Sequence, residues 1–191
     1  MSYLRAFLPW IVFAVIPSGD WQWAALIAVA VSVVGIVRQT GKGLPLDAQI
    51  IEIGSAVYFA ALAALAFADP HTALHPYTPA LASGALGLIG LGSLAIRKPF
   101  TLGVAKQGTP REVWDHPVFI HVNVVITAVW TASFVVGCVV LSLLAHSSVL
   151  ARSAVQTAAF VVPLVFTIQY AGRARAQAAD AGYEMEPSSA A

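Results

Sequence analysis

The chain has 191 residues, of which 59% are apolar and 10% charged, and its mean hydropathy is +0.80. An average soluble domain carries about 25% charged residues, and a single core of this size could not bury so much apolar surface. The composition therefore excludes an ordinary soluble domain and predicts a multi-pass membrane protein. The net charge of +1 offers no long-range field for nucleic acid, and a single cysteine excludes an intrachain disulfide.

Apolar runs separated by turn residues predict an all-α membrane helical bundle of about six transmembrane helices. Residues 1–172 would form one transmembrane domain, and residues 173–191 a polar cytoplasmic tail. The first run is short and contains Pro9, so it reaches only about 20 Å against a hydrocarbon core of about 30 Å. The expected spans are residues 3–16, 21–37, 46–68, 78–96, 117–145 and 152–171.

The distribution of basic residues tests this threading. With six crossings, nine Lys and Arg lie on the side of the N-terminus, the second and fourth loops and the tail, and one, Arg152, lies on the other. Cytoplasmic loops carry the excess of Lys and Arg, which predicts that both termini are cytoplasmic. Five crossings would spoil this asymmetry, so we expect the short first run to cross.

The sizeable polar segment between spans four and five, residues 97–117, is called the elbow below. It holds four of the ten Lys and Arg residues. Thr109 and Glu112 have the spacing of a capping box, with Pro110 at the first helical position. We therefore expect a brief interfacial helix that carries Trp114 at the cytoplasmic membrane surface and ends before Pro117.

Small residues of the fourth span predict close helix packing. Ser83 and Gly87 form a small-xxx-small pair, and residues 84, 87, 90 and 93 are Gly or Ser at intervals of three. Such residues let helix backbones approach within lipid. We favour packing within the bundle, and a homo-oligomer through this span is the alternative.

Ionisable groups inside a membrane are costly and are rarely without a role. Gln49, Glu52 and Ser55 recur at i, i+3 and i+6, which predicts a polar edge of the third span that faces the bundle. A protonatable Glu52 there could carry protons or pair with a substrate cation. Alternatively, it lies near the interface, neutral or paired with Arg38 or Lys42.

Two further spans carry polar or helix-breaking residues. Asn123, Thr127 and Trp130 recur on one face of the fifth span, where Asn123 would form a hydrogen bond to a neighbouring helix. In the sixth span Pro163 has no N–H to donate, which frees the Ala159 carbonyl and predicts a kink.

The histidines suggest a metal site only at first sight. His71 and His75 accompany Asp69, and His116 and His121 accompany Asp115, but neither group has a recognised ligand spacing. A P-loop, a nucleotide-binding glycine fingerprint, a catalytic triad order and a CxxC motif are all missing from the sequence. The sequence therefore predicts no catalytic residue, no cofactor and no metal.

Three local features carry a family resemblance. They are the opening YLRAFLPWIVFAVI, the Arg97-Lys98-Pro99 and PREVW segments of the elbow, and Asn123 followed by Trp130-Thr131-Ala132-Ser133-Phe134. In these features the chain resembles, as a distant relative, the intracellular septation protein A family of bacterial inner-membrane proteins. The resemblance implies a role in septation, cell division or upkeep of the cell envelope, with protein partners, no known cofactor and no catalytic residues.

The leading hypothesis is a non-enzymatic inner-membrane protein whose elbow meets lipid head groups or division and envelope proteins. A small proton-coupled transporter or carrier that uses Glu52 is the first alternative. A membrane-embedded enzyme acting on a lipid or isoprenoid is the second. The candidate functional residues are Glu52, Arg97, Lys98, Pro99, Trp114, Asn123 and Trp130.

Overall fold

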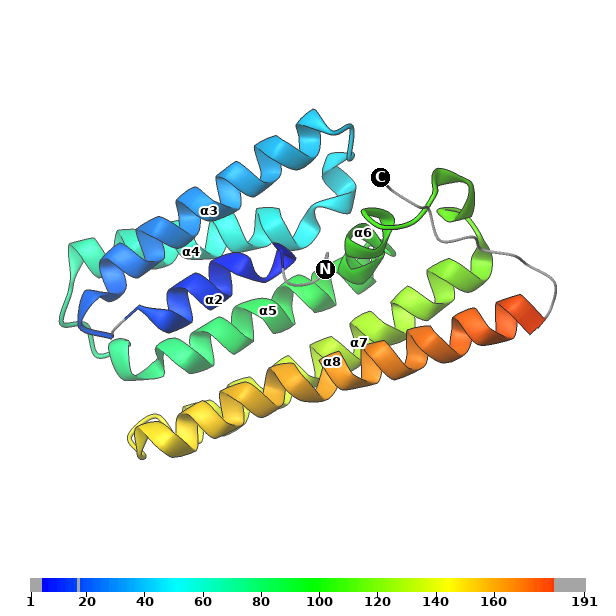
Figure 1. Cartoon of the computed structure of the whole chain (residues 1–191). Coiled ribbons are helices and arrows are strands. Elements are labelled where there is room, and N and C mark those ends of the chain that lie inside the picture. Colours follow the sequence, from blue (N-terminus) through cyan, green and yellow to red (C-terminus); the bar gives the residue numbers. More distant parts are fainter. Residues whose placement is uncertain (1–4, 17, 181–191) are drawn as a thin grey trace.

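The computed structural model describes residues 5–16 and 18–180, and within them it contains helices and no strand (Figure 1). Five helices are long and apolar enough to cross a membrane, which supports an all-α, multi-pass membrane protein. The helices are α2 (Leu8–Val15), α3 (Trp21–Gly41), α4 (Ile50–Ala68), α5 (Thr78–Ala95), α6 (Phe100–Lys106), α7 (Pro117–Leu143) and α8 (Val149–Asp180). Short 3-10 turns are η1 (Ser18–Asp20), η2 (Leu46–Ala48), η3 (His75–Tyr77) and η4 (Arg111–Val113).

Helix α2 and its N-cap contact α4 on one side and α7 on the other. Phe7, at its N-cap, stacks on Trp130 of α7 with ring centroids 4.9 Å apart, and Trp10 stacks on Tyr58 of α4 at 5.1 Å. The Trp10 indole N–H also donates a 2.7 Å hydrogen bond to Ser55 Oγ. Eight helical residues extend only about 12 Å, so the sixth crossing stays a prediction, and so does the placement of the N-terminus that depends on it.

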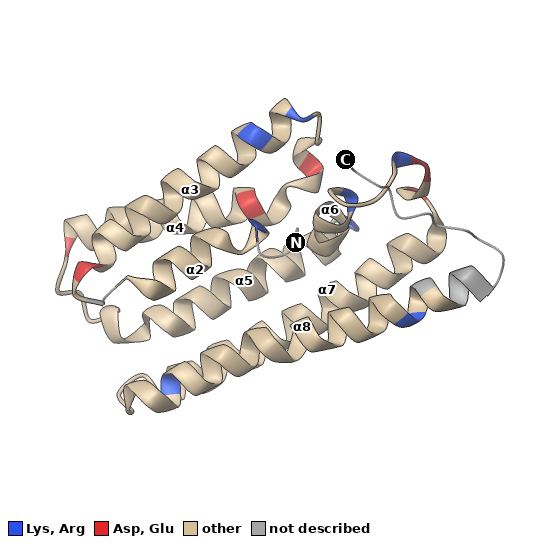
Figure 2. Cartoon of the chain, in the orientation of Figure 1, with Lys and Arg blue, Asp and Glu red and all other residues tan. Residues whose placement is uncertain are grey.

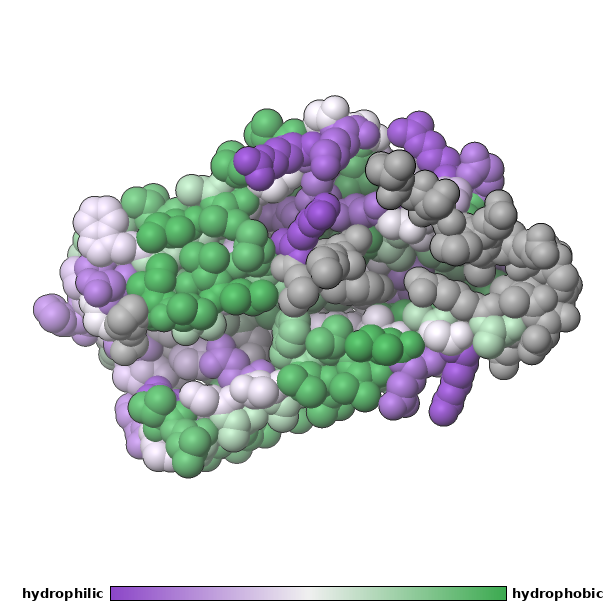
Figure 3. All heavy atoms as spheres, viewed as in Figure 1, coloured by the Kyte–Doolittle hydropathy of each residue, from purple (hydrophilic) through white to green (hydrophobic). Residues whose placement is uncertain are grey.

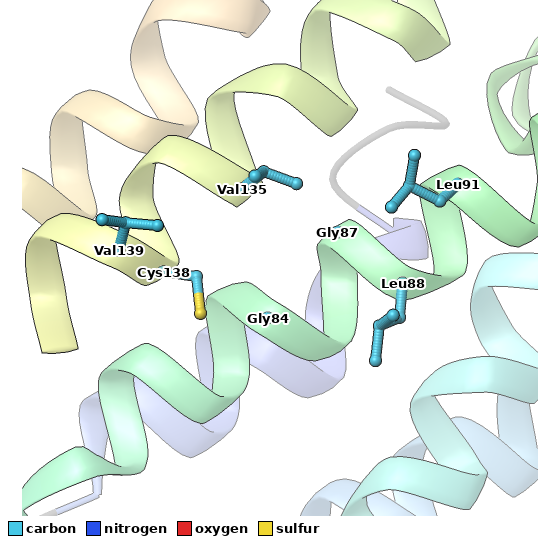
Figure 4. A pocket seen from close by; sticks show the side chains of 7 residues that line it. All are labelled: Gly84, Gly87, Leu88, Leu91, Val135, Cys138 and Val139. Carbon is cyan, nitrogen blue, oxygen red and sulfur yellow. The ribbon is translucent and has the colours of Figure 1, made fainter.

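Helices α5 and α7 pack through the small residues of α5. A Cβ atom placed on Gly84 would lie 3.1 Å from Cys138 Sγ, and one on Gly87 would lie 3.3 Å from a methyl group of Val135. Figure 4 shows both glycines of α5 beside the α7 side chains. This is the packing within the bundle that the spacing predicts, and a homo-oligomer through this helix stays a prediction.

Helix α8 runs through Pro163 without ending, and α7 completes its hydrogen bonding. The Ala159 carbonyl, which has no N–H partner at Pro163, accepts a 2.9 Å hydrogen bond from Ser133 Oγ. Thr167 Oγ1 donates 2.7 Å to the Pro163 carbonyl. The helix extends beyond the predicted end of the span at Ala171 as far as Asp180, so the first part of the predicted tail is helical, and residues 181–191 lie outside the described residues.

The charged residues gather at the ends of the bundle. Lys and Arg concentrate where α3 ends and around α6, and the acidic residues Asp47 and Glu52 lie where α4 begins (Figure 2). Arg152 is in the first turn of α8, which begins at the opposite end. The visible face between the two ends is covered mainly by hydrophobic residues (Figure 3). The end that carries α6 and the elbow is called the basic end below.

The elbow differs from the single capped helix that the sequence predicts. It folds as α6 followed by the one-turn η4, and the capping box is absent. Thr109 Oγ1 donates a 2.9 Å hydrogen bond to the carbonyl of the earlier residue Ala105, near the C-terminus of α6. This is the physical reason for the difference, because the last carbonyls of a helix have no partner within it and compete for nearby donors.

Candidate functional site

Glu52 lies in the first turn of α4 at the basic end, and its side chain is only 3% exposed. Gln49 and Ser55, which share its edge of the helix, are fully buried. The polar edge therefore faces the inside of the bundle, as its spacing predicts. Neither Arg38 nor Lys42 forms an ion pair with Glu52 in the described part of the chain. The ion pair found at this end joins Lys98 and Asp47.

A chain of amide side chains connects Glu52 to the elbow. Gln39 Nε2, on α3, donates a 2.9 Å hydrogen bond to Glu52 Oε1. Gln107 Nε2, at the C-cap of α6, donates 2.7 Å to Gln39 Oε1. Gln49 Nε2 donates 3.1 Å to Thr40 Oγ1 and 3.0 Å to the Leu44 carbonyl. Gln39, Gln49, Glu52 and Gln107 are called the glutamate cluster below.

Two oxygen atoms of the glutamate cluster are buried without a hydrogen-bond partner among the described residues: Glu52 Oε2 and Gln49 Oε1. A buried polar atom left without a partner costs about 1–3 kcal/mol, and more when it belongs to a charged group. Folded proteins rarely leave two such acceptors in one cluster. The cluster can therefore accept a hydrogen-bond donor or a cation.

Arg97, Lys98 and Pro99, the first residues of the elbow, form the junction between α5 and α6. Arg97 has φ of +57°, and its N–H bonds to the Leu94 carbonyl while the Lys98 N–H bonds to the Ser93 carbonyl. This is a Schellman motif, in which glycine is the usual residue at the position of Arg97. Pro99 is buried at the N-cap of α6.

Ser93 and Lys98 hold this junction against its neighbours. Ser93 Oγ accepts a 3.2 Å hydrogen bond from the Phe100 N–H, which satisfies one free donor at the start of α6. Lys98 Nζ lies 2.8 Å from Asp47 Oδ2 of η2. The hydrogen bond from Lys98 holds the pKa of the Asp47 carboxyl below its usual value, and the positive charges of Lys98 and Lys106 add to this effect.

Trp114 is half-buried against the elbow itself. Its indole N–H donates 3.0 Å to the Thr109 carbonyl. Lys106 Nζ lies 5.0 Å and Arg111 Cζ 5.5 Å from ring centroids of the indole, in cation–π contact. Trp114 therefore gathers two cations at one place instead of presenting a bare aromatic face.

Asn123 and Trp130 lie away from the glutamate cluster, on the inner face of α7. The Asn123 side chain donates 2.8 Å to the Phe119 carbonyl of its own helix, so the predicted side-chain bond to a neighbouring helix is wrong. The bond between helices comes from Thr101 Oγ1 on α6, which donates 2.9 Å to the Asn123 backbone carbonyl. Trp130 is fully buried, and its indole N–H donates 2.9 Å to Thr167 Oγ1 of α8. Both residues are buried within the bundle, and Asn123 Oδ1 has no hydrogen-bond partner among the described residues.

In the part of the chain that the structure describes, no three His, Cys, Asp or Glu residues lie together in an arrangement that could hold a metal ion. At the end opposite the elbow, the His146 ring lies across Tyr77, with the ring nitrogen 3.4 Å from the hydroxyl. His75 packs edge-on against Trp21.

Sequence reasoning missed Gln39, whose side chain forms a hydrogen bond to Glu52, and Gln107, whose side chain forms one to Gln39. Gln39 follows Arg38 just after the second predicted span, and Gln107 follows Lys106 within the elbow, so both look like solvated loop residues. Their sole sequence signal is that each is an uncharged amide just after an apolar run and a basic residue. No family model, curated protein or solved structure matches the chain.

Proposed function

We propose that the chain is a non-enzymatic, multi-pass protein of the bacterial inner membrane with both termini in the cytoplasm. Its basic end binds anionic lipid head groups and proteins of the cell envelope or division apparatus. The observation that carries this proposal is the gathering of Lys and Arg at one end of the bundle (Figure 2). The resemblance to the septation protein A family supports the class of partner.

The elbow has the properties of a preformed binding surface. Helix α6 buries Phe100, Thr101 and Val104 against the bundle, so the elbow is held in place rather than ordered on binding. Lys106 and Arg111 lie over the Trp114 indole, and none of the three residues is buried. Each cation near an anionic leaflet contributes roughly 1 kcal/mol, and a tryptophan at this level suits the interface.

The test measures retained lipid and co-purified protein for the detergent-extracted chain. The double variant Lys106→Gln with Arg111→Gln removes about 2 kcal/mol of attraction, which predicts roughly 30-fold weaker binding of anionic lipid. Trp114→Ala should weaken capture of protein partners while the thermal unfolding midpoint changes little. Arg152→Gln, which removes one positive charge at the opposite end, should leave both readouts unchanged. Equal lipid retention and partner capture in all variants would refute the proposal.

A second candidate function has its own support in the glutamate cluster. A buried carboxylate with one free oxygen is a common element of ion-coupled carriers. In this candidate Glu52 binds the coupling ion and Gln39 holds the carboxylate in place. Transport by the reconstituted chain that Glu52→Gln abolishes, with partner binding intact, would favour the carrier over the binding protein.

A further inference from the structure

Two side-chain oxygens on one edge of α4 are hydrogen-bond acceptors without a partner among the described residues. Gln49 Oε1 and Glu52 Oε2 are both buried. Their residues stand three apart at the N-terminus of the helix, a spacing that places side chains on the same face. Glu52 is more than nine-tenths buried and Gln49 is completely buried. Neither oxygen therefore has bulk water to replace the missing partner.

The hydrogen bonds around the pair decide which atoms are left free. The Leu44 carbonyl can only accept, so the amide group it contacts on Gln49 must be the NH2 group and the free atom must be the oxygen. The same reasoning applies to Gln39, whose NH2 group must face the Glu52 carboxylate. Both free atoms are thus hydrogen-bond acceptors, and two acceptors cannot satisfy each other.

A positive charge between the two oxygens would remove both deficits. The neighbouring elements carry Arg38, Lys42, Lys98 and Lys106, and none of these forms an ion pair with Glu52 in the described part of the chain. Lys98 instead pairs with Asp47, the nearest other carboxylate along the chain. The cluster therefore holds one buried carboxylate without a cation of its own.

We propose that the glutamate cluster is a binding site for one monovalent cation, held by Glu52 Oε2 and Gln49 Oε1. The free donor atoms are oxygens, the ligands that hard cations prefer. One carboxylate neutralises one unit of charge, whereas a divalent ion would leave a net charge in a buried site at high cost. A sodium ion or a proton meets this requirement, and the two are separated by experiment.

The experiment follows the thermal unfolding midpoint of the full chain in detergent, in two arms. In the first arm sodium chloride replaces N-methylglucamine chloride at constant ionic strength and pH. In the second arm the pH is varied without sodium. A bound cation at 100 times its dissociation constant raises the midpoint by roughly 5–10 °C. Glu52→Gln should abolish that rise, whereas Glu112→Gln, which removes an exposed carboxylate at the same end, should keep it.

Each outcome decides the proposal. A saturable sodium-dependent rise that Glu52→Gln abolishes identifies sodium, and a pH-dependent rise that it abolishes identifies a proton. If the wild-type chain responds to neither, or if Glu52→Gln responds as the wild type does, the proposal is overturned. If Glu52→Gln fails to fold, Gln49→Ala keeps the carboxylate and should weaken the apparent affinity at least tenfold, while an unchanged affinity overturns the site.

This inference is independent of the lipid and protein binding proposed above. Loss of partner binding in the elbow variants would leave the cation site standing. Cation binding without transport would refute the carrier function and leave the site intact. Direct binding of radioactive sodium to the wild-type chain, at one ion per chain, gives a readout that needs no variant.

Discussion

Gly103→Ala tests how tightly the elbow is docked on the bundle. A Cβ atom on Gly103 would overlap the backbone carbonyl oxygen of Ala48 and would lie 2.6 Å from its carbon and 3.0 Å from its Cα. These neighbours are backbone atoms of η2, so a rotamer change cannot relieve the contact. Helix α6 must move away from η2 by about 1 Å to restore ordinary carbon–carbon contact of about 3.5–4.0 Å.

The loss in free energy of unfolding depends on whether α6 shifts slightly or leaves the bundle. Inserting one methyl group into a close-packed site costs about 1–3 kcal/mol. If α6 instead leaves the bundle, the buried side chains of Phe100 and Val104 are exposed, at about 1.5–3 kcal/mol each. We therefore expect a loss of about 1–6 kcal/mol. At about 2–4 °C per kcal/mol for a chain of this size, the unfolding midpoint falls by at least about 2 °C.

Thermal unfolding followed by a thiol-reactive dye suits this measurement, because Cys138 is the single cysteine and is partly buried between α5 and α7. Gly92→Ala is the matched control, since a Cβ at Gly92 meets nothing within 4 Å. Alanine also favours helix over glycine by about 1 kcal/mol, so this control should not lower the midpoint. An unchanged midpoint for Gly103→Ala would show that α6 is not docked on η2.

Three further predictions follow from individual contacts. Arg97→Gly should raise stability by about 1 kcal/mol, because it removes the strain of a left-handed backbone from a non-glycine residue, and a lower unfolding midpoint would contradict this. Ser133→Ala should cost about 0.6–2 kcal/mol by leaving the carbonyl freed by Pro163 without a donor, and adding Pro163→Ala should recover most of the loss in a double-mutant cycle. Single cysteines at Ala73 and Gly108, in a cysteine-free background, should react with impermeant reagents from opposite sides of the membrane, and labelling from one side would refute the threading.

Much of the fold is predictable because its signals are local. The spans starting at Trp21, Thr78 and Pro117 begin at the predicted residues, where an acidic turn or a proline marks the helix start. The elbow was harder to predict. Thr109 has the right spacing for a capping box, but its hydroxyl bonds to Ala105. Whether a hydroxyl caps forwards or bonds backwards depends on the helix before it, and a spacing rule does not include that helix.

The candidate site was predictable only in part. The period of the helix was enough to place Glu52 on a buried polar edge with Gln49 and Ser55. The helix period did not predict that Gln39 and Gln107 lie near Glu52. Gln39 lies 13 positions before Glu52 in the sequence and Gln107 lies 55 positions after it. The contacts of Gln39 and Gln107 depend on how the C-terminal ends of α3 and α6 meet beside the first turn of α4.

The sequence by itself determined the membrane environment, the apolar spans and the concentration of positive charge at one end, since each follows from composition and from short-range periodicity. The tertiary structure alone decided which polar atoms find partners and which do not. Ser133 completes the hydrogen bonding of α8, Gly103 admits the backbone of η2, and Gln39 leaves Glu52 Oε2 free. The physical reason is that hydrogen bonds and steric exclusion act over a few ångströms, between helices whose adjacency no local pattern specifies.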